Sequence, residues 1–269
     1  MTAFWTHFTF EFKTGLRNAT MLMMNYLFPL GFYALIGLVM TQINPLFRET
    51  MLPAMLVFVP MASALLGLPS PMVEEREAGI YRTYKINGVP ALSILVIPIL
   101  TTILHALIAS TVIVATAAPL FGAALPVNWV SFVLVALLTV VTFAAIGALI
   151  GVVSADSRAT VLWSQLIFLP SMLIGGLMLP LNLLPKAILL FSGLLPSARA
   201  MQAFVGLAYG YETKLDPIVS VGVLLATAVL AFGLAVYLFD WDRVNQARRG
   251  HPLMALLVLL PAVVGLLLG

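Results

Sequence analysis

The sequence has little charge and no cysteine. Of its 269 residues, 13 are Lys or Arg and 10 are Asp or Glu, so charged residues make up 9%, against about 25% in soluble globular domains. So few charges cannot cover the surface of a soluble protein of this length. The composition therefore excludes a soluble enzyme, a disordered chain and a nucleic-acid-binding protein. The absence of cysteine excludes disulfides and thiolate metal sites.

Several catalytic and energy-coupling motifs are also absent. None of the four lysines follows a glycine, so the chain has no P-loop to hold ATP and Mg²⁺. The three histidines are far apart in the sequence and no H-E-x-x-H or G-x-S-x-G motif occurs, so we expect no catalytic centre, metal site or cofactor in this chain. The acidic residues lie nearly all in predicted loops, which argues against the intramembrane carboxylates of ion-coupled carriers. If the chain transports a substrate, we therefore expect the energy for that work to come from another polypeptide.

The sequence is instead rich in long apolar runs, and hydrophobic residues make up 62% of it. A helix needs about 20 apolar residues to cross the roughly 30 Å hydrocarbon core of a membrane. Six segments satisfy this requirement and predict an all-α membrane protein, with spans at 25–43, 51–73, 91–118, 129–153, 160–180 and 217–239. A seventh apolar segment, 252–269, is about 18 residues long and is marginal as a span.

The distribution of Lys and Arg predicts the orientation of these spans. With the N-terminus in the cytoplasm, the inner segments hold nine of the 13 basic residues and the outer segments hold four. This bias follows the positive-inside rule and supports a multi-pass topology with a cytoplasmic N-terminus. The membrane in which we expect the protein is the inner membrane of a bacterium or archaeon. If 252–269 also crosses, the C-terminus lies outside. Three basic residues after the sixth span are expected to contact anionic lipid: Arg243, Arg248 and Arg249.

Two segments differ from simple spans. Within residues 1–24, a stripe of large apolar residues predicts a helix lying in the membrane interface, although alternating phenylalanines there also suit a strand. The stripe consists of Phe4, Trp5, Phe8, Phe12 and Leu16. Residues 181–206 are apolar but broken by prolines and a glycine, which predicts two short helical pieces at the outer surface. We therefore divide the chain into an interfacial helix (1–24), a six-span domain (25–245) and an extra apolar segment (246–269).

The loop 74–90, EEREAGIYRTYKINGVP, is a dense charge cluster in a chain that avoids charge. Its acidic start and basic end complement the macrodipole of one helix, which Gly88 and Pro90 then end. A solvated turn and a short cytoplasmic helix that docks a partner both fit this pattern. The residues expected to dock the partner are Glu74, Glu75, Glu77, Tyr81, Arg82, Tyr84 and Lys85.

Two motifs together resemble the membrane subunits of ABC-2-type exporters. The first is the E-R-E-x-G at the end of the second span, followed by a short polar helix and N-G-V-P. The second is GGLMLPLNLLP, residues 175–185, followed by Leu195-Pro196 and Ala198-Arg199-Ala200. The resemblance covers residues 1–245 and implies that the loop 74–90 carries the coupling helix that contacts the ATPase subunit. The seventh apolar segment departs from the family pattern.

Polar and sulfur-containing residues within the spans are candidates for a substrate path. His105 is the one ionisable residue well inside a span, and its alternative role is packing. Ser164, Gln165 and Met172 in the fifth span are further candidates, because polar groups and adaptable methionines suit a promiscuous wall. Their alternative role is packing, and for the methionine also contact with lipid.

Two other short motifs each allow a structural and a functional interpretation. Gly147 and Gly151 form G-x-x-x-G in the fourth span, which predicts close helix packing within the chain or at a dimer seam. Asp156 and Arg158 form the inner turn between the fourth and fifth spans. This turn is either a capped connection or a second contact with the ATPase.

Taken with the resemblance, these patterns predict the permease subunit of an ABC exporter, with ATP and Mg²⁺ bound by a separate P-loop ATPase. A second copy or a sister permease would complete the path, membrane lipids would surround it, and the substrate would be a small hydrophobic molecule, as in multidrug or lipid export. Two alternatives remain open. One is a secondary carrier or channel, and the other is an intramembrane transferase with His105 as its base.

Overall fold

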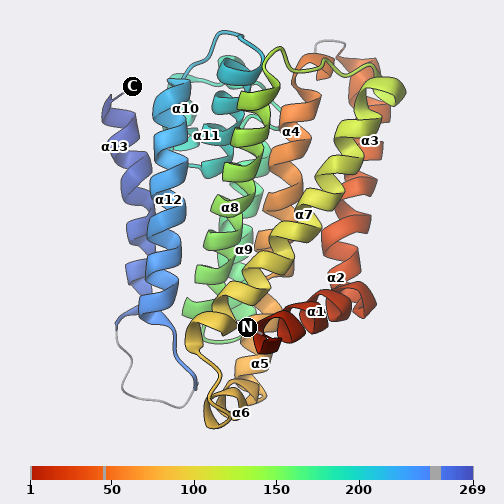
Figure 1. Ribbon diagram of the computed structural model, residues 1–269. Coiled ribbons are helices and arrows are strands. Elements are labelled where there is room, and N and C mark those ends of the chain that lie inside the picture. Colours follow the sequence, from red (N-terminus) through yellow and green to blue (C-terminus); the bar gives the residue numbers. More distant parts are fainter. Residues whose placement is uncertain (1, 45–46, 243–249, 269) are drawn as a thin grey trace.

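The computed structural model describes residues 2–44, 47–242 and 250–268, and every regular element within these ranges is helical. Long helices form one bundle, and a further helix, α1, lies across one end of it (Figure 1). The long helices are α3 (Phe28–Ile43), α4 (Phe47–Ala62), α7 (Ala91–Phe121), α8 (Trp129–Val153), α9 (Ser157–Ile174) and α12 (Pro217–Leu238). The short helices α5 (Pro69–Glu77) and α6 (Ile80–Ile86) mark what we call the α6 end, and α10 (Lys186–Ser192) marks the opposite, α10 end.

The all-helical membrane fold is confirmed, with a difference at the fifth span. Within the described residues, five helices are long and apolar enough to cross a membrane: Ala19–Ile43, Phe47–Glu77, Ala91–Phe121, Trp129–Val153 and Pro217–Leu238. A sixth is added if the bent pair Lys186–Ser192 and Pro196–Ala208, whose halves meet at 96°, counts as one span. The predicted span 160–180 is instead α9, whose 18 residues rise about 27 Å. It ends at Gly175 because Gly176 has a φ of 86°, which no helix continues.

Local sequence signals set the helix boundaries. The side chain of Asn128 accepts a hydrogen bond from the backbone N–H of Ser131 at 3.0 Å and so begins α8. Asp216 begins α12 in the same way, with Pro217 in the first helical position. Gly122 ends α7 with a φ of 68°. Each of these residues satisfies backbone groups that a helix end would otherwise leave without partners.

Three π-helical turns interrupt the regular helices. η1 (Met23–Leu27) lies between α2 (Ala19–Leu22) and α3, η2 (Ser63–Gly67) connects α4 to α5, and η4 (Phe204–Ala208) follows α11 (Pro196–Ala203). η1 and η2 contact each other, so two irregular turns meet inside the bundle. Such turns are rare and occur frequently at functional sites.

Helix α8 lies at the centre of the bundle and contacts α4, α5, α7 and α12. A Cβ atom on Gly147 would overlap the backbone carbonyl of Ala64, and one on Gly151 would lie 2.9 Å from the Sδ atom of Met72. The two glycines therefore allow η2 and α5 to approach α8 closely. This contact is made within one chain.

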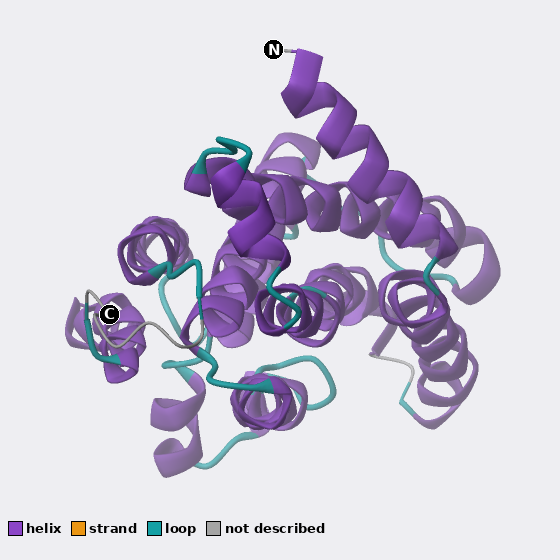
Figure 2. Cartoon of the chain, turned by 90° about the horizontal axis from the view of Figure 1, so that it is seen from below, coloured by secondary structure: helices purple, strands orange, loops and turns teal. Residues whose placement is uncertain are grey.

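The N-terminal segment forms a helix, α1 (Thr2–Arg17), so the strand alternative is wrong. It lies across the α6 end of the bundle and extends beyond it (Figures 1 and 2). The predicted apolar stripe is divided between two environments: Phe8 and Phe12 are half-buried, whereas Trp5 and Leu16 are exposed. The side chain of Phe4 lies outside the described residues. The division arises because α1 turns the side that carries Phe12 and the buried Gly15 toward α7.

The C-terminal segment runs beside α12 as a 3₁₀ helix, η5 (Pro252–Leu259), followed by α13 (Leu260–Leu268) (Figure 1). It covers Arg199, which lies in the segment predicted to form short helical pieces at the outer surface but is only 1% exposed in α11. The guanidinium donates to the carbonyl of Gly193 at 2.9 Å and to that of Ala262 in α13 at 3.3 Å. The extra segment therefore shields a buried cation. Arg243, Arg248 and Arg249 lie outside the described residues.

Candidate functional site

The charged loop 74–90 forms two helices instead of one. Its three glutamates lie at the C-terminal end of α5, which continues the second span. The chain then turns at Gly79, whose φ of 74° lies in the left-handed region that glycine adopts without strain. α6 begins at Ile80, so the expectation that the glutamates stabilise the start of a single docking helix is wrong. They precede that helix.

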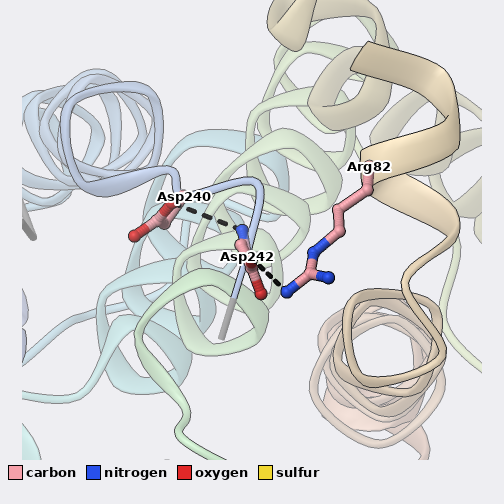
Figure 3. Close-up of polar contacts among 3 residues, drawn as sticks. All are labelled: Arg82, Asp240 and Asp242. Atoms are coloured by element: carbon pink, nitrogen blue, oxygen red, sulfur yellow. Dashed lines mark hydrogen bonds and ion pairs between the residues drawn. The ribbon is translucent and has the colours of Figure 1, made fainter. Parts of the chain in front are cut away.

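Helix α6 is tied to the segment that follows α12. Arg82 forms an ion pair with Asp242, and the backbone N–H of Asp242 donates to the carboxylate of Asp240 at 3.3 Å (Figure 3). The Nζ atom of Lys85 lies 6.0 Å from the centre of the Trp241 ring, at the limit of a cation–π contact. Because the side chain of Arg82 is 55% exposed, the ion pair contributes at most about 1 kcal/mol.

Tyr81 anchors α6 from the inside. Its side chain is 2% exposed, and its ring lies 5.8 Å from that of Phe239, centre to centre. Burial raises the pKa of Tyr81 far above its usual value, and the nearby carboxylate of Glu75 raises it further, so the phenol stays neutral. The hydroxyl has no hydrogen-bond partner among the described residues. Tyr81 thus faces the protein, although the sequence placed it among the docking residues.

The outer side of α6 presents a mixed surface. Ile86 is 85% exposed at the end of the helix and Ile80 is 38% exposed. Arg82 and Lys85 are exposed beside them, and Tyr84 is half-buried, with a pKa that burial raises. On the preceding helix, Glu74 and Glu77 are exposed whereas Glu75 is half-buried. The docking role of these residues stays a prediction, and the structure places all of them except Tyr81 and Glu75 at or near the surface.

The turn between α8 and α9 lies at the same end of the bundle. The carboxylate of Asp156 accepts a hydrogen bond from the backbone N–H of Ala159 at 2.9 Å and so begins α9. Arg158 is exposed, and a contact between this turn and an ATPase stays a prediction.

Arg76 is a structural residue that the sequence analysis missed. Its guanidinium is buried and donates to the carbonyls of Val152, at 2.9 Å, and of Ser154. These carbonyls belong to the C-terminal end of α8, where a cation is favourable. No local signal identifies this contact, because the partners lie more than 70 residues apart in the sequence.

An apolar cleft lies between α3, α4 and α9. Rings from all three helices meet there: Phe32 lies 4.1 Å from Phe58, and Phe58 lies 6.0 Å from Phe168, centre to centre. Met172 lines the cleft, and its role in a substrate path stays a prediction. The remaining volume is only about 10 Å³, so the side chains close the cleft in this conformation.

Ser164 and Gln165 do not line this cleft. Ser164 is buried, and its hydroxyl has no partner among the described residues, while Gln165 is half-buried. Their assignment to the substrate path stays a prediction.

At the α10 end, the cleft adjoins a larger cavity of about 460 Å³. Phe47, Leu177 and Met178 line both spaces. The cavity is also lined by Gln202 and Lys214, so its walls are more polar than those of the cleft. Cleft and cavity together follow α4 toward the α10 end of the bundle.

His105 lies apart from Met172, in a different cavity between α1, η1, α5 and α7. Its Nδ1 atom lies 2.6 Å from the hydroxyl of Tyr26, and its ring stacks on that of Phe12 at 4.6 Å. Glu75 lines the same cavity. No glutamate or aspartate is close to His105 in the sequence, because Glu11 belongs to α1 and Glu75 to α5, whereas His105 belongs to α7.

Comparison with known proteins agrees with this architecture. The model of the ABC-2 family transporter proteins matches residues 40–237, which is most of the chain and extends from the end of α3 to the end of α12. No curated protein and no solved structure matches the chain. Because the family model matches well over half of the chain and includes the second span and α6, the chain belongs to the ABC-2 family of transporter proteins and is a multi-pass permease subunit.

Proposed function

We propose that this permease subunit works in an ATP-driven exporter whose separate P-loop ATPase binds α6. The observation that carries the proposal is the position of α6: a short helix at the end of the bundle, with exposed Ile80 and Ile86 and flanking charges. Nothing in the rest of the chain supplies a nucleotide site, since the sequence has no P-loop. Members of this family work with an ATPase subunit in general.

The contacts of α6 would transmit movement of the ATPase. α6 is joined to the second span through α5, and Arg76 of α5 holds the end of α8. Tyr81 and Arg82 connect α6 to the segment after α12. A displacement of α6 therefore acts on α4, α8 and α12, and α4 forms one wall of the apolar cleft.

The cleft between α3, α4 and α9 is the proposed substrate path. Its aromatic rings and methionines favour a small hydrophobic, drug-like or lipid-like substrate. α9 also carries a stripe of exposed leucines outside the cleft, at helical spacing: Leu162, Leu166, Leu169 and Leu173. This stripe would contact lipid or the second permease subunit that completes the path. We place the α6 end in the cytoplasm, because Arg82, Lys85 and Arg158 gather there.

The test is co-purification in a mild detergent with an assay of ATP hydrolysis. The native chain is expected to bring down a P-loop ATPase in stoichiometric amount. Ile86→Asp, which places a charge on the proposed contact, should release the ATPase. Val127→Asp is the matched control, because Val127 is 84% exposed in a loop at the opposite end. Equal recovery of the ATPase with both variants would contradict the assignment of α6.

A second experiment separates coupling from binding. Replacing Glu77 and Arg82 together should leave the protein inserted but uncouple ATP hydrolysis from transport. Unchanged transport by this double variant would argue against the coupling role.

A secondary carrier is the second candidate, because the structure does bring Glu75 to the cavity of His105. It predicts that the chain purifies without an ATPase and transports substrate alone in vesicles with an ion gradient.

A further inference from the structure

A small polar cavity lies where α1 crosses the bundle, and we call it the α1 cavity. It has a volume of about 40 Å³ and is lined by residues of α1, η1, α5 and α7. This volume has room for a few atoms. The cavity shares no lining residue with the apolar cleft or with the cavity at the α10 end.

Two buried polar side chains in its walls each have one polar atom without a hydrogen-bond partner among the described residues. Asn25 is 6% exposed, and its Oδ1 atom accepts no hydrogen bond from the described residues. His105 is 3% exposed; its Nδ1 atom contacts Tyr26, but its Nε2 atom has no partner among the described residues. Buried polar groups are nearly always satisfied, so these two atoms, which line one cavity, are available to a hydrogen-bonding ligand there.

The backbone around the cavity is shaped to leave this space. Asn25 belongs to the π-helical turn η1, and the facing wall contains Gly67 at the end of the π-helical turn η2. On the third side, a Cβ atom on Gly15 of α1 would lie 2.9 Å from the Nε2 atom of His105. Any larger residue there would occupy the space in front of the imidazole. Two π turns and a glycine at one small cavity are typical of a functional site.

The charges of the lining residues favour a positively charged ligand. Glu11 and Glu75 line the cavity, and no lysine or arginine does. Within the described residues, no three His, Asp or Glu side chains are close enough together to hold a metal ion. The walls therefore favour a cation that spans well-separated acceptors through its own N–H donors.

We propose that the α1 cavity binds a primary ammonium group. The three N–H groups of the ammonium would donate hydrogen bonds to the carboxylate of Glu75, the Oδ1 atom of Asn25 and the Nε2 atom of His105. His105 accepts in the tautomer whose Nδ1–H donates to the hydroxyl of Tyr26. A quaternary ammonium lacks these donors and is bulkier, so the cavity discriminates against it.

The position of the cavity indicates where the ammonium group comes from. Trp5 and Phe10 of α1 are each 62% exposed, which suits a helix lying at the membrane interface. The ligand would therefore be the headgroup of an ethanolamine lipid or the amine of an amphiphilic molecule dissolved in the membrane. Binding does not depend on the proposed ATPase, so it is measured on the purified chain.

The test is equilibrium binding of radiolabelled decylammonium to the purified chain in phosphatidylcholine nanodiscs, with empty nanodiscs subtracted. Saturable binding is expected for decylammonium, and binding of decyltrimethylammonium should be at least tenfold weaker. Glu75→Gln and Asn25→Leu should each weaken decylammonium binding by about tenfold or more, because each removes a hydrogen bond to a charged group. Glu77→Gln is the matched control, because Glu77 lies on the same helix but outside the cavity.

The outcomes are distinct. Equal binding of the two probes to the native chain, or equal effects of Glu75→Gln and Glu77→Gln, would overturn the proposal and leave a cavity filled by water. Because the comparison of probes uses the native chain, it remains decisive if a variant fails to fold. Competition by nanodiscs that contain phosphatidylethanolamine would identify the lipid headgroup as the source. Decylammonium binding without such competition would identify a free amine.

Discussion

The buried contact between Arg76 and the end of α8 leads to a quantitative prediction. Replacing Arg76 with Met keeps much of the side-chain volume but removes the donors to the carbonyls of Val152 and Ser154. A hydrogen bond to a charged group contributes about 1.5–3 kcal/mol. Two such bonds, at about 1.5 kcal/mol each, give a loss of at least about 3 kcal/mol in the free energy of unfolding. The weaker contact of Arg76 with Gly151, at 3.4 Å, is left out of this sum.

The measurement is equilibrium unfolding in mixed detergent micelles, compared with the native chain. Arg158→Met is the matched control: Arg158 is exposed near the same turn, and its loss should change the free energy by less than about 0.5 kcal/mol. Arg76→Lys should fall between the two, because an ammonium group cannot reproduce the planar fork of donors. If Arg76→Met and Arg158→Met destabilise the protein equally, the capping argument is refuted.

Three further predictions follow from packing and burial, each read as the midpoint of thermal unfolding in one detergent. Gly147→Ala should destabilise the protein by about 1–3 kcal/mol, whereas Gly233→Ala, with no atom within 4 Å of its Cβ, should be neutral or stabilising; equal midpoints would refute this. Tyr81→Phe should not lower the midpoint, because the buried hydroxyl has no partner among the described residues; a clear loss would reveal one. Deleting 251–269 should lower the midpoint, because it uncovers the buried cation of Arg199. Adding Arg199→Met to the shortened chain should restore part of the lost midpoint. No restoration would contradict the shielding role.

The sequence predicted those parts of the structure that depend on local signals. Apolar runs located five of the long helices, and Asp156 was recognised as a candidate cap from its place in a short turn. The break at Gly79 was missed, because a charge pattern that favours one helix outweighed a single glycine. Local reasoning treats a glycine within a helical pattern as a modest cost, whereas here it separates two helices.

The candidate sites were harder to predict than the helices, because their residues meet through tertiary contacts. Tyr81 resembles a surface residue in its own loop, but it is buried against a segment that follows α12. Arg199 resembles a loop residue until α13 covers it. Glu75 and His105 belong to different helices, and nothing in either helix alone indicates that they line one cavity. Met172 does line the apolar cleft, but its role in a substrate path stays a prediction.

The two attachments of α6 differ in strength, and the difference has a mechanical consequence. Toward α5 the attachment is covalent and backed by the buried Arg76. Toward the segment after α12 it combines the buried contact of Tyr81 with Phe239 and the partly exposed ion pair of Arg82 with Asp242. α6 is thus joined firmly to α5, whereas the polar part of its contact with the segment after α12 can open. The attachment to α5 carries a displacement of α6 to α4 and α8, whereas its contact with the segment after α12 weakens when the ion pair opens and then rests on Tyr81 and Phe239. Because salt screens such a pair, a higher ionic strength should weaken the contact between α6 and the segment after α12. The attachment of α6 to α5 and the second span should not change.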